Sequence, residues 1–262
     1  MGNAKRYKNE KKSDRKILTI LFLIFLVLFI YSGIKVIRYL IDAKKNQNLI
    51  ENMAEFIFID NENKDNIDKY NVDFESLKQK NSDAIAWIKV NGTNIEYPVV
   101  KTTNNDYYLT HNFNKEYNSA GWIFADYKNK LDGTDKNLVI YGHNMRDDSM
   151  FGSLKKVINE EWYNNEDNRY ITLITESQTQ IYEVFSVYQI EKEDYYIQTN
   201  FNNETEFSKF VDTLKKRSKK DFNVNVSSED DILTLSTCAN NNKYRVVLHA
   251  KKYIRYQKRE DF

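Results

Sequence analysis

The feature that most constrains this chain is an uninterrupted apolar run close to its N-terminus. Residues 17–34 carry no charge and read ILTILFLIFLVLFIYSGI. As a helix they would extend roughly 27 Å, close to the roughly 30 Å hydrocarbon thickness of a bilayer. A run that is apolar all round suits lipid better than one side of a buried core helix. We therefore predict a membrane-spanning helix over residues 17–41, in which Lys35 and Arg38 extend their charged ends to the membrane surface.

The charges that flank this run predict its orientation. Residues 1–16 carry a net charge of +5 and residues 35–45 a net charge of +3. Since the flank richer in Lys and Arg stays in the cytoplasm, we expect a single-pass protein of the cell membrane with a cytoplasmic N-terminus and an extracellular body. A cleaved signal peptide is the nearest alternative, but Ser32-Gly33 is not followed by the usual small-residue cleavage pattern.

The composition of the rest of the chain excludes several classes of protein. The whole chain carries a net charge of +1, so the residues outside the two basic segments carry −7. An acidic body argues against nucleic acid as a partner. A single Cys excludes a disulfide scaffold and multi-cysteine metal sites, and three scattered His show no metal-binding spacing. We expect neither a metal nor another cofactor.

Four segments follow from these patterns. Residues 1–16 form the cytoplasmic tail, residues 17–41 the membrane anchor, residues 42–71 a polar, helical stalk or linker, and residues 72–262 the extracellular body. Within the body, residues 87–100 predict a β-hairpin around Asn91-Gly92. Further strands are expected over residues 121–125, 137–141, 170–175, 181–190, 231–237 and 244–253.

The number of strands indicates the architecture of the body. Apolar residues at helical spacing predict two helices among the strands, over residues 151–162 and 207–214, and the cap Asp73 predicts a short helix before the strands, at Phe74 and Leu77. About eight strands with few helices favour a mainly β domain whose sheet closes on itself, since closure removes exposed strand edges.

The single cysteine, Cys238, is the first candidate for chemistry. It follows the expected strand at the start of a loop, where a side chain is both held and accessible. In an exported protein a lone thiol is either free and reactive or a small buried core residue. Arg245 begins the next expected strand, where a guanidinium would lower the pKa of the thiol or bind an oxyanion. A surface salt bridge is the alternative interpretation of Arg245.

A thiol nucleophile usually needs a base, and the chain offers three histidines. His143 follows the expected strand 137–141 and comes directly after Gly142, which allows close backbone approach. His249 lies on the same strand face as Arg245 and is a competitor. His111 lies in a loop or short helix and is the weaker candidate. We favour His143 as the base.

Several motifs resemble those of the class B sortases. Thr234-Leu235-Ser236-Thr237-Cys238, followed by an Arg on the next strand, resembles the sortase active-site signature, and the segment around His143 resembles the histidine region of class B members. Shorter matches are Ala86-Trp87-Ile88, Tyr97-Pro98-Val99-Val100, Tyr107-Tyr108-Leu109 and Ala120-Gly121-Trp122-Ile123-Phe124. Two features depart from the pattern: Ala239 stands where class B members often carry an acidic residue, and the turn before Arg245 is shorter than in some relatives.

The resemblance implies a fold and an activity. The fold would be a closed eight-stranded β-barrel with peripheral helices. The activity would be that of a membrane-anchored cysteine transpeptidase of Gram-positive bacteria. Such an enzyme cuts a sorting signal near the C-terminus of secreted proteins and transfers them to an amine acceptor, commonly in peptidoglycan. Cys238 would be the nucleophile, His143 the acid and base, and Arg245 the group that binds the oxyanion or the substrate backbone. The residues implied to line the substrate groove are Asn105, Leu109 and Ser236.

Two other functions stay open. An extracellular cysteine protease would use the same Cys, His and Arg and would hydrolyse its acyl-enzyme with water. A non-catalytic surface binding module would keep Cys238 inert. Transfer to an acceptor amine therefore distinguishes a transpeptidase from the protease. The reactivity of the thiol distinguishes either enzyme from the binding module.

Overall fold

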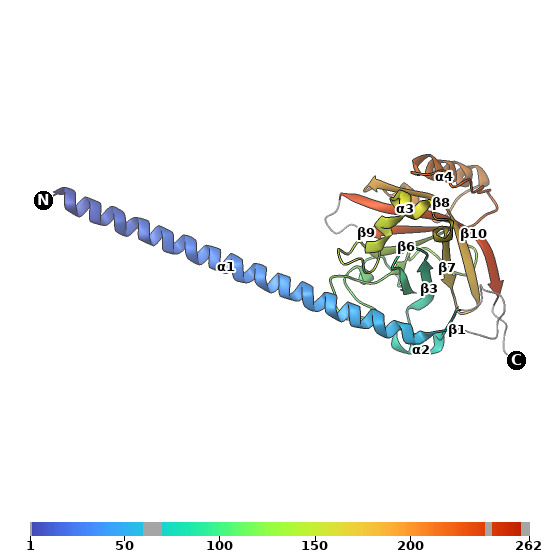
Figure 1. The fold of residues 1–262 in the computed structure, drawn as a ribbon, viewed down its shortest axis with the longest axis horizontal. Helices are drawn as coiled ribbons and strands as arrows, with labels where there is room; N and C mark the ends of the chain where they lie inside the picture. The colour runs from blue at the N-terminus through green and yellow to red at the C-terminus, as the bar shows by residue number, and fades with distance from the viewer. Residues whose placement is uncertain (1, 60–69, 239–242, 258–262) are drawn as a thin grey trace. The chain divides into compact units, whose positions relative to one another are not determined.

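The computed structural model describes residues 2–59, 70–238 and 243–257, which form two compact units (Figure 1). The first unit ends at Lys45 and the second begins at Asn46. Helix α1 (Gly2–Met53) supplies the first unit and the beginning of the second. From Arg15 onward it contains an 18-residue window with a mean hydropathy of 2.8, none of which is buried. By length and composition this helix could cross a membrane.

The segment expected to be a helical stalk is in part folded into the second unit. Leu49 and Met53 of α1 are buried, as is Phe56 in the short 3-10 helix η1 (Ala54–Phe56). Strand β1 (Ile57–Ile59) then pairs with β2 (Tyr70–Val72) in a two-stranded antiparallel sheet. The chain is therefore helical through η1 as far as Phe56 and extended over β1, and the side chains of Leu49, Met53 and Phe56 pack into the body.

Eight strands form a closed barrel in the order β10-β8-β7-β3-β4-β5-β6-β9. This confirms the predicted mainly β, closed eight-stranded fold. Neighbours pair antiparallel except for β4 with β5 and β6 with β9, which run parallel. The strands are β3 (Ala84–Val90), β4 (Glu96–Val100), β5 (Phe124–Ala125), β6 (Asn137–His143), β7 (Tyr170–Ile174), β8 (Gln178–Glu191), β9 (Ile232–Cys238) and β10 (Tyr244–Gln257).

Helical segments connect and cover these strands. Figure 1 shows α4 beside β8, and the Ser186 hydroxyl of β8 donates a 2.7 Å hydrogen bond to the carbonyl of Leu214 in α4. The remaining helical elements are α2 (Phe74–Lys80), η2 (Tyr107–Leu109), η3 (Gly152–Ile158), α3 (Glu160–Tyr163), η4 (Glu166–Arg169), η5 (Tyr195–Ile197) and α4 (Glu204–Arg217).

The two helices predicted among the strands have different outcomes. Helix α4 confirms the second prediction, and its buried apolar face begins at Phe207 and ends at Leu214. The segment 151–162 is instead the 3-10 helix η3 followed by the single-turn helix α3. Phe151, Leu154 and Val157 are all buried, and a spacing of three suits the three-residue turn of a 3-10 helix. The extended backbone of Asn159 separates the two pieces.

The strand expected over residues 121–125 is shorter than predicted. Strand β5 contains only Phe124 and Ala125. Gly121 has a φ of +58°, a left-handed conformation that does not continue a strand. The chain before β5 thus turns where Gly121 stands, and this turn lies beside one of the expected catalytic residues.

Candidate active site

The parallel pair of β6 and β9 brings two expected catalytic residues together. Their register begins with Asn137 opposite Ile232 and ends with His143 opposite Cys238. Because parallel strands end at the same edge of a sheet, the last residue of each strand reaches the same end of the barrel. The backbone therefore places His143 and Cys238 side by side, although they lie far apart in the sequence.

The imidazole of His143 is held in one tautomer. The side chain is only 3% exposed, and its Nε2 lies 2.7 Å from the carbonyl oxygen of Leu109. A carbonyl oxygen only accepts, so Nε2 carries the hydrogen and donates it. In the neutral ring Nδ1 is then the free base. Burial lowers the pKa of His143, and the hydrogen bond to Leu109 partly offsets this effect. Burial thus favours the neutral form of the His143 imidazole.

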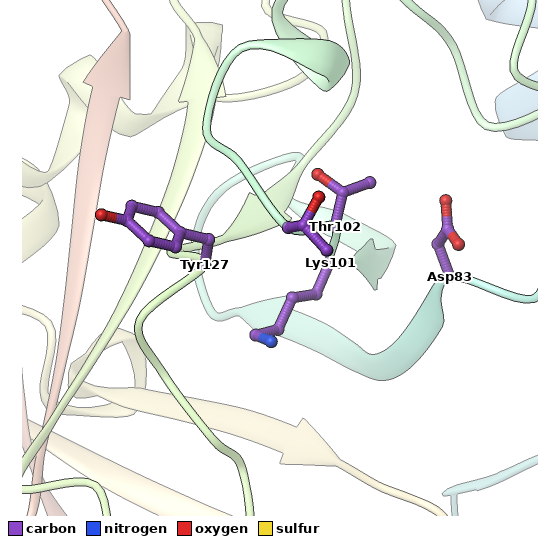
Figure 2. A pocket seen from close by; sticks show the side chains of 5 residues that line it. Asp83, Lys101, Thr102 and Tyr127 are labelled. Atoms are coloured by element: carbon purple, nitrogen blue, oxygen red, sulfur yellow. The ribbon is translucent and has the colours of Figure 1, made fainter.

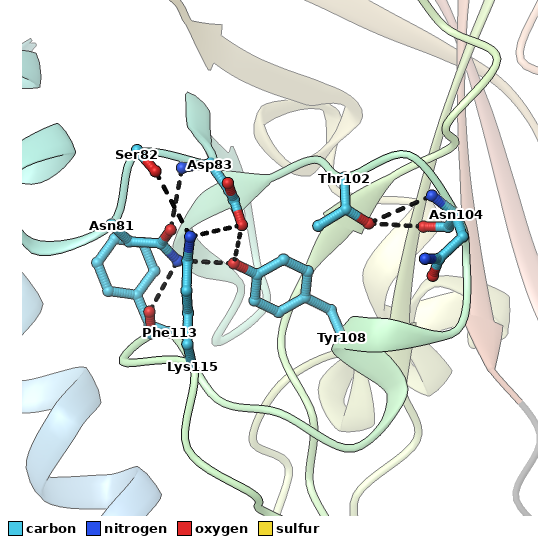
Figure 3. Close-up of polar contacts among 8 residues, drawn as sticks. All are labelled: Asn81, Ser82, Asp83, Thr102, Asn104, Tyr108, Phe113 and Lys115. Carbon is cyan, nitrogen blue, oxygen red and sulfur yellow. Dashed lines mark hydrogen bonds and ion pairs between the residues drawn. The ribbon is translucent and has the colours of Figure 1, made fainter.

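A network outside the barrel holds the short helix η2, which ends at Leu109 (Figure 3). Asn81 donates a 2.8 Å hydrogen bond to the Tyr108 hydroxyl, which in turn donates to Asp83 at 2.8 Å. Lys115 forms a 3.0 Å ion pair with the same carboxylate. Since Tyr108 is buried and adjacent to Leu109, these bonds fix the position of the carbonyl that orients His143.

Gly121 lies against the same turn. A Cβ at this position would lie 2.3 Å from the Tyr108 carbonyl oxygen, 2.9 Å from the Leu109 carbonyl oxygen and 2.9 Å from Cδ2 of His143. Real side chains do not approach so closely. The amide of Trp122, the next residue, donates a 2.9 Å hydrogen bond to the Tyr108 carbonyl. A residue without a side chain is therefore needed to bring η2 and His143 into contact.

Arg245 lies close to the backbone that carries Cys238. Its Nη1 donates a 2.8 Å hydrogen bond to the carbonyl of Thr237, the residue before Cys238. The amide of Val246 donates to the Thr237 hydroxyl at 3.0 Å, which ties the start of β10 to the end of β9. A guanidinium has five N–H groups, so the contact with Thr237 leaves donors for a bound substrate.

The structure separates His143 from the other two histidines. His249 is fully buried, pairs with Thr234 within the barrel, and has hydrogen bonds at both ring nitrogens, with the Tyr188 hydroxyl and the Thr234 hydroxyl at 2.9 Å each. Burial lowers the pKa of His249 to about 3. His111 stacks on Tyr107, and its Nδ1 donates to the Tyr107 carbonyl at 2.8 Å. His143 alone of the three is the register partner of Cys238.

The three residues expected to line the substrate groove have different environments. Asn105 is half-buried and has hydrogen bonds with the Asp126 side chain and the Tyr127 amide. Leu109 is half-buried and contributes its carbonyl to His143. Ser236 is 1% exposed, and its hydroxyl lies 3.0 Å from that of Tyr196. The burial of Ser236 does not favour direct contact with a substrate, and its assignment stays a prediction.

Figure 2 shows residues that line an open cleft of about 650 Å³. Its lining residues are Asp83, Lys101, Thr102, Thr103 and Tyr127, which include no expected catalytic residue. The cleft is connected to the site through Tyr127, whose backbone amide donates a 2.9 Å hydrogen bond to Asn105 Oδ1, and through Asp83, which accepts from the Tyr108 hydroxyl at 2.8 Å. The expected catalytic residues thus lie at the strand ends and do not line this cleft.

Sequence reasoning missed two residues of this site. Gly121 stands inside a motif that we noted, but only the fold shows that its missing side chain makes room for His143. Asp126 lies in a connection between strands, where a lone acidic residue gives no spacing signal, and the fold brings it to Asn105. Both act through contacts between distant segments, which a local pattern does not contain.

Comparisons with known proteins agree with this geometry. The family model of the sortase domain matches residues 88–253. Sortase B of Listeria monocytogenes is 35% identical over 237 residues, which are 88% of this chain and 94% of that relative. The solved structure of Clostridium perfringens sortase B has a TM-score of 0.65 and 41% identity, covering 69% of this chain and 100% of that one. A Staphylococcus aureus sortase B–substrate complex has a TM-score of 0.65 and 34% identity, covering 69% of this chain and 84% of that one.

Proposed function

Because this chain belongs to the class B sortases, which are cysteine transpeptidases, we propose that it cuts a sorting signal near the C-terminus of secreted proteins and transfers them to an amine acceptor of the peptidoglycan. The observation that carries this proposal is the register of β6 and β9, which pairs His143 with Cys238 at the same end of the barrel. The solved complex of a Staphylococcus aureus sortase B with a substrate supports a substrate-binding role for this fold.

The first half of the proposed reaction forms a thioacyl-enzyme. The sulfur of Cys238 attacks the scissile carbonyl carbon, and the electron pair of the carbonyl moves onto its oxygen. His143 holds the thiol proton on Nδ1, since Nε2 keeps its own hydrogen toward Leu109. Collapse of the tetrahedral intermediate breaks the C–N bond, and the Nδ1 proton goes to the leaving amine.

The second half reverses these roles. The acceptor amine attacks the thioester carbon, and Nδ1 of His143 takes a proton from it as the new C–N bond forms. The C–S bond breaks, and the thiolate of Cys238 is released. Water in place of the amine would give a free carboxylate, which is the outcome of the protease alternative.

Arg245 serves the oxyanion or the substrate backbone in this proposal. The hydrogen bond from Nη1 to the Thr237 carbonyl holds the guanidinium next to the strand end that carries the nucleophile. A preorganised donor at this position stabilises negative charge that develops on the attacked carbonyl oxygen.

We further propose that α1 anchors the enzyme in the membrane. Its apolar window and its unburied side chains support a single span, and the denser positive charge before the span supports a cytoplasmic N-terminus. The catalytic unit would then meet secreted proteins and the cell wall outside the cell.

An assay with and without an amine tests the proposed function. The chain from residue 42 onward is incubated with a panel of sorting-signal peptides, alone and with a short peptide that carries a free amino terminus. We expect cleavage in both cases and a ligated product only with the amine. Cleavage at the same rate with no ligated product would favour the protease, and no cleavage of any peptide would favour the binding module.

Three variants test the assigned residues in the same assay. Cys238→Ala is expected to abolish cleavage, because no other cysteine is available. His143→Ala is expected to lose far more activity than His111→Ala, the matched control, whose imidazole bonds only locally. Wild-type cleavage by either of the first two variants would contradict the assignment.

A further inference from the structure

We propose that Asp126 is a positioning residue that fixes the side-chain amide of Asn105, so that one N–H of this amide faces the backbone of the bound peptide. This inference rests on the proposed function and deepens it. It concerns a buried carboxylate that the catalytic steps do not use, and a residue that the resemblance only implied to line the groove.

Asp126 is a buried carboxylate whose hydrogen-bond donors are all uncharged groups. It is 2% exposed. Its Oδ2 accepts from the Tyr141 hydroxyl at 2.8 Å and from Asn105 Nδ2 at 3.0 Å, and its Oδ1 accepts from the Lys128 amide at 2.9 Å. Within the described part of the chain it forms no ion pair. A buried charge without a cation is costly unless several hydrogen bonds stabilise it, so this arrangement is specific.

These contacts leave Asn105 one orientation. The Tyr127 backbone amide can only donate, so the amide oxygen of Asn105 faces it, at 2.9 Å. The Asp126 carboxylate can only accept, so the amide nitrogen of Asn105 faces Asp126. A flipped amide would oppose like groups at both contacts. The second N–H of Asn105 has no partner among the described residues, and the half-buried side chain is accessible.

The carboxylate of Asp126 connects Asn105 to β6, the strand that ends at His143. Tyr141 precedes His143 by two residues on β6, so both side chains lie on the same face of the strand. Their register partners on β9 are Ser236 and Cys238. Two residues of a strand advance by about 7 Å, which is also the spacing of alternate carbonyls in an extended peptide. In this proposal the acyl chain attached at Cys238 extends along β6, which would bring a carbonyl toward Asn105.

Asp126 also has backbone hydrogen bonds that stabilise the surrounding loop, so a structural role is the alternative explanation. Its amide donates to the Val139 carbonyl at 2.9 Å, and its carbonyl accepts from the Asn129 amide at 3.0 Å. The test must therefore separate substrate binding from stability. A split between KM and kcat does so, because loss of stability alone lowers the amount of active enzyme and leaves KM unchanged.

The first experiment compares Asp126→Asn with Asp135→Asn. An Asn at position 126 turns its NH2 group toward a donor in either orientation, the Lys128 amide or Asn105 Nδ2, and replaces a charged acceptor with a neutral one, so the hold on Asn105 is weakened. We expect KM for the sorting peptide to rise about tenfold, the effect of one lost hydrogen bond, with kcat within about twofold. Asp135 accepts amide hydrogens of Lys130 and Leu131 in the same connection and is the matched control, with unchanged KM. An unchanged KM in Asp126→Asn overturns the proposal.

The second experiment asks whether Asp126 acts through Asn105. Asn105→Ala leaves Asp126 its bonds to Tyr141 and Lys128 and is expected to fold. It should raise KM about tenfold, and adding Asp126→Asn should raise KM no further. If the double variant raises KM by the product of the two single effects, the proposal is overturned. An unchanged KM in Asn105→Ala alone would also overturn it, even if Asp126→Asn does not fold.

A third measurement tests the network without turnover. In an NMR spectrum of the chain from residue 42 onward, one side-chain amide proton of Asn105 should exchange slowly, since it is donated to a buried carboxylate. Equal, fast exchange of both protons overturns the proposal. If the wild type cleaves no sorting peptide but shows the slow proton, the proposed function fails while the network stands, so the two failures are distinguishable.

Discussion

The carbonyl oxygen of Leu109 accepts a 2.7 Å hydrogen bond from Nε2 of His143, and this contact decides which nitrogen of the imidazole handles protons. The contribution of Leu109 is thus its backbone, and the position of η2 matters more than the leucine side chain. Substitutions that move η2 should therefore affect catalysis, although they lie outside the Cys, His and Arg motifs.

Gly121→Ala is expected to reduce kcat strongly. The new Cβ would overlap the carbonyls of Tyr108 and Leu109 and the ring of His143, so η2 or the imidazole must move. A displacement of about 1 Å at a reacting group costs on the order of 10²-fold in rate. Steady-state kinetics on the folded variant, at a temperature well below its melting point, measures this effect.

Gly92→Ala is the control for backbone strain. Gly92 lies in the turn between β3 and β4 and also has a positive φ, +68°. The atoms nearest to a Cβ at this position belong to the side chain of Asn168, and not to η2 or His143. We expect it to lower the melting temperature and to leave kcat unchanged. Equal losses of kcat in both variants would mean that strain, and not the contact with His143, causes the effect.

Arg245→Lys is expected to lower the rate by about 10²-fold or more. Lysine keeps the positive charge but loses the planar set of donors, so it cannot bond both the Thr237 carbonyl and an oxyanion. The pH dependence of thiol alkylation should change little, because the charge remains. Turnover close to that of the wild type would leave Arg245 with an electrostatic role only.

Acidification is expected to destabilise the fold through His249. Burial lowers its pKa to about 3, whereas the unfolded chain has a pKa near the usual value. Between these values the unfolded state binds a proton that the folded state does not. The free energy of unfolding therefore falls as the pH drops below about 6.5, by up to about 1.4 kcal/mol per pH unit.

Urea unfolding at pH 7 and pH 5 measures this dependence. His143, whose pKa burial also lowers, contributes with the same sign. His249→Gln removes the titrating group and keeps polar atoms for Tyr188 and Thr234, so its unfolding free energy should depend less on pH. An unchanged dependence in this variant would show that other groups are responsible.

Removal of residues 1–41 is expected to leave a soluble, active body, whereas removal of residues 1–56 should destabilise it. Leu49, Met53 and Phe56 are buried in the second unit, and each buried side chain of this size contributes about 1.5–3 kcal/mol. Solubility, thermal melting and peptide cleavage of the two chains check this. Insolubility of the longer chain would mean that the apolar run belongs to the core.

The fold was predictable where a single segment carried its own signal. The hairpin around Gly92 and helix α4 follow from a turn sequence and from apolar spacing, and both are present. The break at Asn159 was not predictable, because the apolar residues of η3 and α3 are spaced at intervals that also suit one longer helix. The two-stranded sheet of β1 and β2 joins segments too short for a periodicity to be recognised.

For the site, the sequence indicated which residues to examine but not their relationships. In the sequence, His143 comes directly after Gly142 and His249 lies within an expected strand, so both were candidates for the base. Only the fold shows that His143 lies at a strand end and that His249 is buried in the barrel. The contact from Asp126 to Asn105 joins two loops, and the contact from Leu109 to His143 uses a backbone atom. Such contacts depend on tertiary structure and have no local sequence signal.

The parallel pairing of β6 with β9 has a consequence for the order in which the molecule is made. Ribosomes release β6 well before β9, so a growing chain holds its imidazole long before its thiol has been synthesised. The barrel stays open until β10, the last strand to be made, pairs with both β9 and β8. A chain that terminates before β9 therefore lacks both a closed barrel and the expected nucleophile, Cys238.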